Sequence, residues 1–309
     1  MATEFKFKCH FCAVCDGTGC IGQIPGMGGV RRNENFRLNF DGWEVCRKQE
    51  EQLLKEFLSR PENERVPKIR IAPITGAVEN IGYRDEETYY HDMIFSAEKA
   101  GIGLCIGDGT PDIKLKAGIN AIKELQISKP GKKAAVFIKP YSNKKISERI
   151  NWAKNQAEII GIDIDSYNIV TMRNLVNLER KTAGELIELK KSLTVPFALK
   201  GVFLRDDIDL IKEVHPDIVY VSNHGGRVET RTGSTAEFLL QHRKELLSNC
   251  GELWIDGGIR TRLDVATAMS LGADQILIGR PFVSALCKGG EELLRKKAIE
   301  LKTPYKENQ

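Results

Sequence analysis

A histidine and an arginine with complementary chemistry stand close together in the segment VYVSNHGGRVET. His224 belongs to the residue type whose ordinary pKa, about 6.5, suits a general base at neutral pH. Arg227 is a permanent cation whose planar group binds a carboxylate through two hydrogen bonds. The two glycines between them let the backbone turn sharply and approach a ligand. A lone histidine is more often structural, but the nearby arginine reverses that preference. The segment therefore predicts a base beside a carboxylate-binding group.

The elements that must position these residues follow a repeat from Ile69 onward, in which short apolar runs alternate with segments of helical period. This alternation is typical of a parallel sheet with crossover helices. The helical stretches include SERINWAKNQAE (147–158) and RDDIDLIKEV (205–214). Eight strand candidates cover residues 69–75, 101–107, 134–140, 159–165, 196–202, 218–223, 253–258 and 275–280.

Eight strands with eight helices predict an α/β fold, the (β/α)₈ TIM barrel. An open doubly wound sheet is the alternative, but the glycine-rich fingerprint that should follow its first strand is missing. In a barrel the chemistry lies on the loops at the carboxyl ends of the strands. Polar residues stand at many of these ends, namely Asp163, Asp165, Lys200, Asn223, Asp256 and Arg280.

The repeat also divides the chain. We expect residues 69–301 to form the barrel and residues 302–309 to be a tail. Residues 1–68 do not follow the repeat and are interpreted as a cysteine-rich amino-terminal extension packed on the barrel. Within it, WEVCRKQEEQLLKEFLSR has helical period.

Composition excludes some classes of partner. The net charge of +4 arises from 46 basic and 42 acidic residues spread along the chain, so no basic stripe indicates nucleic acid. No apolar stretch of about eighteen residues indicates a membrane span, and the first residues do not resemble a signal peptide. The expectation is a cytoplasmic protein.

Four cysteines crowd the amino terminus at Cys9, Cys12, Cys15 and Cys20. Their spacing, C-x₂-C-x₂-C-x₄-C, is close to an iron–sulfur run but has one residue more. Four thiolates also suit tetrahedral zinc, although structural zinc more often uses two separated pairs. A metal of either kind is the favoured interpretation; free thiols or a disulfide are the alternative.

Four segments carry a family resemblance: SNHGGR (222–227), LKGV (199–202), IDGGIRTRLDV (255–265) and LIGRP (277–281). They resemble the signatures of the FMN-dependent α-hydroxy-acid oxidases and dehydrogenases, the glycolate oxidase and flavocytochrome family. The resemblance is strong over residues 194–283. It implies an FMN enzyme that oxidises a small 2-hydroxy acid to a 2-oxo acid, with hydride transfer to flavin N5 assisted by a base. It also implies a homo-oligomer, such as the tetramer that is frequent in the family. It does not identify the electron acceptor.

The resemblance assigns roles residue by residue. His224 would be the base, Asp165 its partner, Lys200 the cation beside the flavin, and Tyr141 a contact to the substrate oxygen. Arg227 would bind the substrate carboxylate, and Arg173 is the candidate for a second such arginine. The remaining FMN contacts implied are Ala72, Pro73, Ile74, Gly107, Lys139, Asp163, Ser222, Asp256, Gly257, Gly258, Arg260, Gly279 and Arg280.

Some positions depart from the family. Lys139, Asp163 and Gly107 stand where a glutamine, a threonine and a serine are usual, and a Lys139–Asp163 ion pair would alter the electrostatics around the flavin. The amino-terminal tyrosine that usually contacts the substrate is absent. Two alternatives follow: an FMN barrel of different chemistry, like inosine-monophosphate dehydrogenase or type 2 isopentenyl-diphosphate isomerase, or a non-catalytic flavin- or phosphate-binding protein.

Overall fold

Eight parallel strands form the centre of the computed structural model, which describes residues 34–169, 176–228 and 230–306. The strands are β1 (Lys68–Ile71), β2 (Cys105–Gly107), β3 (Ala134–Ile138), β4 (Ala157–Asp163), β5 (Phe197–Val202), β6 (Ile218–Val221), β7 (Glu252–Ile255) and β8 (Gln275–Ile278). Their spatial order is β1-β8-β7-β6-β5-β4-β3-β2. A parallel bridge between Arg70 and Gly103 links β1 to the segment before β2. The (β/α)₈ barrel predicted from the repeat is therefore confirmed.

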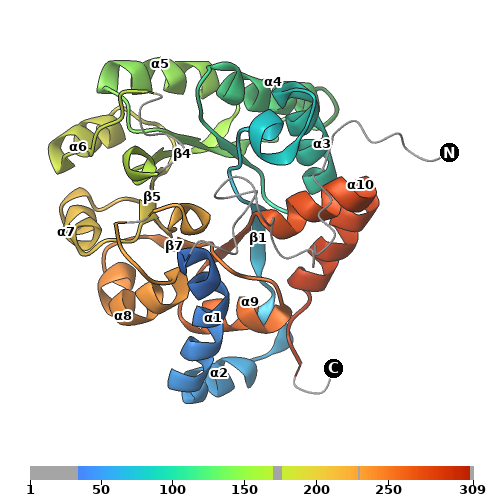
Figure 1. Cartoon of the computed structure of the whole chain (residues 1–309), viewed down its shortest axis with the longest axis vertical. Coiled ribbons are helices and arrows are strands. Elements are labelled where there is room, and N and C mark those ends of the chain that lie inside the picture. Colours follow the sequence, from blue (N-terminus) through green and yellow to red (C-terminus); the bar gives the residue numbers. More distant parts are fainter. Residues whose placement is uncertain (1–33, 170–175, 229, 307–309) are drawn as a thin grey trace.

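Helices surround the strands (Figure 1). The α-helices are α1 (Glu34–Gln49), α2 (Glu51–Leu58), α3 (Glu86–Lys99), α4 (Ile113–Ser128), α5 (Asn143–Ala153), α6 (Ala183–Lys191), α7 (Arg205–Val214), α8 (Thr235–Leu247), α9 (Arg262–Ser270) and α10 (Arg280–Lys302). Short helical turns are η2 (Glu62–Arg65), η3 (Ala77–Ile81), η4 (Ser166–Asn168) and η5 (His224–Gly226).

One helix boundary predicted from the sequence is wrong. The stretch 147–158 was expected to be helical throughout, but α5 ends at Ala153 and β4 begins at Ala157. Glu158 belongs to that strand, and its carboxylate lies 2.6 Å from the Arg70 guanidinium of β1. Backbone pairing of Ala157 with Ala134 of the neighbouring strand β3 outweighs the helical preference of the local sequence.

The barrel interior is closed by large side chains. Phe137, Tyr220 and Trp254 come from β3, β6 and β7, and their rings contact one another with centroids 5.5 to 6.4 Å apart. Arg70 lies over the Trp254 ring at 4.7 Å. The interior is thus packed solid, so a ligand must bind at the end of the barrel rather than inside it.

Helix α1 precedes the repeat and packs on the barrel beside α8 and α9 (Figure 1). Trp43 and Cys46 of this helix are fully buried. Arg47 of α1 forms an ion pair with Asp264 of α9 at 2.8 Å. The first helix is therefore an integral part of the packed structure.

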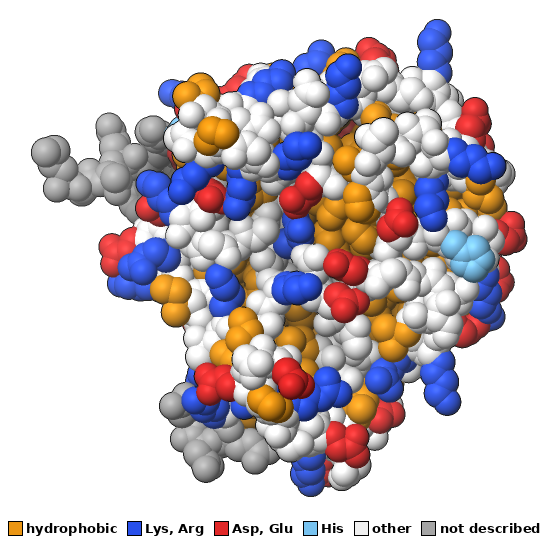
Figure 2. Space-filling model, turned by 180° about the vertical axis from the view of Figure 1, so that it is seen from behind, with side chains coloured by type: hydrophobic (Ala, Val, Ile, Leu, Met, Phe, Trp, Pro, Cys, Tyr) orange, Lys and Arg blue, Asp and Glu red, His pale blue; other side chains and the backbone are white. Residues whose placement is uncertain are grey.

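The surface is of mixed charge. On the face shown in Figure 2, Lys and Arg side chains are interspersed with Asp and Glu. No helix in the described part of the chain combines the length and apolar character needed to cross a bilayer.

Candidate active site

A cavity of about 540 Å³ is lined by residues that follow the carboxyl ends of the strands. Its volume lies within the range of about 300–1,000 Å³ that is usual for ligand sites. Most of the residues predicted from the sequence meet there: Ala72, Pro73, Ile74, Lys139, Lys200, His224, Arg227, Asp256, Gly257, Gly258, Arg260, Gly279 and Arg280. Strands far apart in the sequence therefore bring their terminal residues to one site.

His224 has an unusual backbone conformation, with a φ of +58°. A side chain in this left-handed region costs roughly 1–2 kcal/mol, so neighbouring contacts must hold it there. The Ser222 hydroxyl accepts a hydrogen bond from His224 N at 3.2 Å, and Asn223 Oδ1 accepts one from Gly226 N at 3.0 Å. These contacts fix the loop that presents the imidazole.

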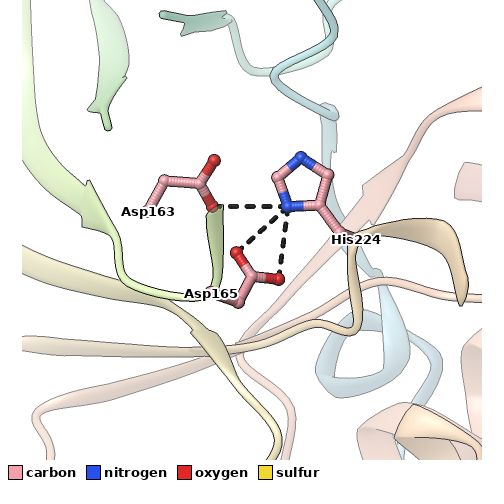
Figure 3. Close-up of side chains that lie close together, drawn as sticks. All are labelled: Asp163, Asp165 and His224. Carbon is pink, nitrogen blue, oxygen red and sulfur yellow. Dashed lines mark hydrogen bonds and ion pairs between the residues drawn. The ribbon is translucent and has the colours of Figure 1, made fainter. Parts of the chain in front are cut away.

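The imidazole faces two carboxylates (Figure 3). Its Nδ1 lies 3.0 and 3.2 Å from the two oxygens of Asp165 and 3.7 Å from Asp163 Oδ1. The other ring nitrogen, Nε2, points away from both carboxylates (Figure 3). When Nδ1–H donates to Asp165, Nε2 carries the lone pair that can accept a proton.

The electrostatics favour an uncharged imidazole before substrate binds. Burial lowers the pKa of His224 well below its ordinary value of 6.5, and the Lys200 ammonium lowers it further, against an opposing effect of Asp163. Burial and the adjacent Asp163 carboxylate raise the pKa of Asp165. Burial also acts to raise the pKa of Asp163, but Lys200, His224 and Lys139 outweigh it, so that this pKa is well below 3.8.

Two lysines share the Asp163 carboxylate from neighbouring strands. Lys200 Nζ donates to Asp163 Oδ1 at 2.6 Å, and Lys139 Nζ lies 3.8 Å from Asp163 Oδ2. The Ser166 hydroxyl bridges the second contact, since it accepts from Lys139 Nζ at 3.2 Å and donates to Asp163 Oδ2 at 2.7 Å. The predicted Lys139–Asp163 pair is present, but Lys200 is the closer partner.

Arg227 lines the cavity and has no hydrogen-bond or ion-pair partner among the residues that the structure describes. Its Nε is buried without a hydrogen-bond acceptor. Burial lowers the pKa of this guanidinium below its ordinary value, although Asp163 and Asp165 oppose the effect. A partly buried cation without a partner is unfavourable, so the position suits an anionic ligand.

Two hydroxyl groups fix the carboxylate of Asp256. Its Oδ2 accepts hydrogen bonds from the Tyr220 hydroxyl at 2.7 Å and the Ser222 hydroxyl at 3.0 Å. Its Oδ1 is buried, and in the described residues it has no partner. Burial raises the pKa of this carboxyl. Because Asp256 lines the cavity, Oδ1 can accept a hydrogen bond from a hydroxyl group of a bound ligand. Ser222 does not line the cavity but supports Asp256 and His224.

Two arginines form another part of the cavity wall. The Arg260 and Arg280 guanidinium groups lie over the rings of Phe40 and Phe36 of α1, at 4.5 and 4.4 Å from the ring centroids. Arg280 also donates to the Gly225 carbonyl at 3.0 Å. Burial lowers the pKa of Arg260 to about 10. Paired guanidinium groups of this kind suit a phosphate.

Helix α1 also fastens the loops after β6 and β7. Asn39 and Asn223 exchange side-chain hydrogen bonds of 2.8 and 3.0 Å, and both are fully or almost fully buried. Trp43 Nε1 donates to the Gly257 carbonyl at 2.8 Å. A Cβ at Gly258, whose φ is +73°, would overlap the Asn39 carbonyl oxygen. Sequence reasoning missed this role of α1, because no short-range pattern signals contacts between such distant residues.

Not every predicted residue reaches the cavity wall. Tyr141 is buried, its hydroxyl lies 3.3 Å from Thr110 Oγ1, and it is not among the lining residues. Gly107, Asp163 and Asp165 also lie behind the wall. Arg173 and the cysteines at 9, 12, 15 and 20 fall outside the described residues. Lining residues that the sequence did not indicate are Thr75, Gly76, Gly109, Thr110, Lys114 and Ile169.

The donor set fits FMN. Arg260 and Arg280 supply cations for a phosphate, and Asp256 Oδ1 supplies a buried acceptor for a ribityl hydroxyl. Lys200 and Lys139 supply positive charge for the part of a flavin that becomes negative on reduction. The backbone around Pro73 provides a wall on the β1 side of the cavity.

Comparisons with known proteins agree with this reading. Residues 114–303 match the family model described as FMN-dependent dehydrogenase. A 2-hydroxyacid oxidase of Dictyostelium discoideum is 35% identical over 111 residues, which are 36% of this chain and 28% of that protein. An L-lactate dehydrogenase (cytochrome) of Saccharomyces cerevisiae is 35% identical over 125 residues, which are 39% of this chain and 21% of that protein. The chain thus spans less than a third of the length of these curated relatives.

Solved structures show the same fold. Mandelate oxidase with (S)-2-phenylpropionate superposes with a TM-score of 0.63 at 20% identity, covering 87% of this chain and 83% of that one. Likeness at such low identity concerns the fold alone, whereas the family model covers more than half of the chain. The chain therefore belongs to the FMN-dependent dehydrogenase family.

Proposed function

We propose that this protein oxidises a small 2-hydroxy acid to the corresponding 2-oxo acid. The observation that carries the proposal is the unpartnered guanidinium of Arg227 in the same cavity as the uncharged base His224. A 2-hydroxy acid needs both groups, because it presents a carboxylate and, on the next carbon, a hydroxyl whose proton must leave.

Arg227 binds the substrate carboxylate. Two parallel hydrogen bonds from a guanidinium fix the orientation of a carboxylate as well as its position. The carboxylate also supplies the negative charge that this cation lacks among the described residues. Binding therefore relieves a partly buried, unpaired charge and orients the neighbouring carbon in the same event.

His224 takes the hydroxyl proton at Nε2. The hydrogen bond between Nδ1 and Asp165 holds the ring in one orientation. Once Nε2 is protonated, the new positive charge lies beside Asp165 and Asp163. The same carboxylates that orient the base thus stabilise its charged form.

FMN, the cofactor of the family, would be held by Arg260 and Arg280 at its phosphate, by Asp256 at its ribityl chain and by Lys200 near its ring. It supplies the acceptor for the hydrogen that leaves the hydroxyl-bearing carbon with its electron pair. Tyr141, Arg173 and the other contacts predicted from the family resemblance stay predictions, as do the homo-oligomer, the electron acceptor and a metal at the amino-terminal cysteines.

The test is anaerobic stopped-flow mixing of FMN-loaded protein with a panel of 2-hydroxy acids. At least one acid should bleach the flavin absorbance. The His224→Ala variant should bind FMN and be reduced by dithionite but not by substrate, while His91→Ala, which changes an exposed histidine of α3, should behave like the wild type. Full reduction of the His224→Ala protein by substrate would refute the assignment.

The same experiment separates the alternatives. A non-catalytic flavin-binding protein would keep its flavin oxidised with every acid, although dithionite reduces it. A barrel of different chemistry would also keep its flavin oxidised with these acids, so bleaching by any of them distinguishes the proposed function from both alternatives.

A further inference from the structure

Two buried ammonium groups face the cavity side by side, which is unusual because like charges repel strongly at low dielectric. Lys139 directly follows β3, and Lys200 lies in β5; both are 4% exposed, and both line the cavity. The Asp163 carboxylate lies between them and does not line the cavity. From the cavity, a ligand therefore meets two cations with a carboxylate behind them.

The three groups carry a surplus of one positive charge. Asp163 ends β4, where its backbone pairs with Lys200 of β5, so its position is fixed by the sheet. Its shorter contact, 2.6 Å, goes to Lys200. Lys139 is held less closely, through Ser166 and the 3.8 Å contact with Asp163. One carboxylate cannot neutralise two ammonium groups, so the charge of Lys139 is the less compensated of the two.

Two other carboxylates near the cluster, Asp165 and Asp256, offset part of its positive charge. Asp165 bonds to His224, and its pKa is raised by burial and by Asp163. Asp108 accepts a hydrogen bond from the backbone N of Lys139 but forms its ion pair with Arg149 at 3.0 Å. Lys139 nevertheless lines the cavity, where its ammonium group can act on a bound ligand.

We propose that Lys139 is a second cation for bound FMN and that Asp163 sets how much positive charge the two lysines present to it. A flavin gains negative charge on reduction, and charges beside the ring tune its reduction potential. Lys139 makes reduction more favourable, and Asp163 limits that effect. The inference requires FMN binding but no particular substrate, so its failure would leave the proposed oxidation of a hydroxy acid standing.

The experiment measures the flavin midpoint potential, with a chemical reductant, and the dissociation constant for sulfite, an anion that adds to oxidised flavins. The variants are Lys139→Gln, Lys139→Arg, Asp163→Asn and the double variant Lys139→Gln/Asp163→Asn, each loaded with FMN. Lys116→Gln is the matched control, because it removes the same charge from an exposed lysine of α4 that lies over Trp152.

Lys139→Gln should lower the potential and weaken sulfite binding about 10- to 100-fold, as expected for losing one interaction with a charged group. Asp163→Asn should shift both quantities in the opposite direction, and the double variant should lie near the wild type. Lys139→Arg, which keeps the charge, should change the potential and the sulfite affinity little. The comparison of Lys139→Gln with Lys139→Arg tests the proposal even if Asp163→Asn fails to fold.

An unchanged potential in Lys139→Gln would overturn the inference. So would shifts of the same sign in the two single variants.

Discussion

His224 Nδ1 and the Asp165 carboxylate lie 3.0 Å apart, although 59 residues separate them in the chain. The contact joins the loop after β6 to the turn after β4, so the barrel itself sets its geometry. Because Nδ1 is committed to Asp165, the ring offers Nε2 to the substrate. The orientation of the base is therefore built into the fold.

Replacing Asp165 should slow flavin reduction by substrate without preventing FMN binding. Asp165→Asn keeps the shape of the side chain but removes the charge that stabilises a protonated His224. We expect flavin reduction by substrate to slow by about 100-fold, as for loss of a group that supports a general base, while FMN stays bound. Stopped-flow absorbance measures the rate. Asp112→Asn, at a carboxylate outside the cavity, is the control; an unchanged rate in Asp165→Asn would contradict the role.

The pH profile should reflect the lowered pKa of His224. Only the unprotonated imidazole can accept the hydroxyl proton, and a lowered pKa keeps it unprotonated at more acid pH. The second-order rate constant for flavin reduction, measured at low substrate so that it reports the free protein, should therefore stay level as the pH falls through 6.5 and decline only at more acid pH. A half-maximal rate at or above pH 6.5 would show that the pKa is not lowered.

Arg227→Met should raise the stability of the protein and lower its activity. The substitution removes a partly buried cation whose Nε has no hydrogen-bond acceptor, so the FMN-loaded protein without substrate should gain about 1–3 kcal/mol in free energy of unfolding. At the same time kcat/KM should fall about 100-fold or more, because the substrate carboxylate loses its partner. Urea unfolding and steady-state kinetics give the two quantities. The comparison variant is Arg205→Met, which removes an exposed arginine paired with Glu245; a loss of stability in Arg227→Met would count against an unpaired charge.

Gly258→Ala should dislodge α1. The added Cβ would require a strained positive φ and would overlap the Asn39 carbonyl oxygen. We expect a loss of more than about 3 kcal/mol in the free energy of unfolding, the level at which core overpacking becomes severe, together with weaker FMN binding. Gly131→Ala separates the two causes, because Gly131 has a φ of +82° and nothing within 4 Å of a Cβ. It should cost only about 1–2 kcal/mol. Similar losses in both variants would mean that backbone strain alone explains the effect.

The sequence could predict the barrel and much of its cavity, because strand ends obey a local pattern and a general rule. The apolar runs around Lys200 and before His224 could be recognised as buried strands, and parallel strands must end on one side of the sheet. Asp165 follows β4 and His224 follows β6, on either side of β5, and the family resemblance rather than the strand pattern implied that they pair.

The rest depended on packing that has no local signature. The matched segment at Tyr141 gave no sign that the hydroxyl would turn to Thr110 instead of lining the cavity. Lys139 could be paired with Asp163 by charge, but the closer approach of Lys200 follows from the register of β4 and β5. Asn39 has an ordinary polar position in a helix, and only the folded chain shows that it bonds to Asn223.

The contacts of α1 have a consequence for the order in which the molecule is completed. This helix is synthesised before the barrel strands, yet the partner of Asn39 lies 184 residues downstream and that of Trp43 lies 214 residues downstream. Contacts of such long separation close late, because the intervening chain must first be synthesised and folded. The Phe36 and Phe40 rings that support the two arginines therefore dock only when β8 has been made. We therefore expect tight FMN binding only late in folding, after α1 has docked on the barrel.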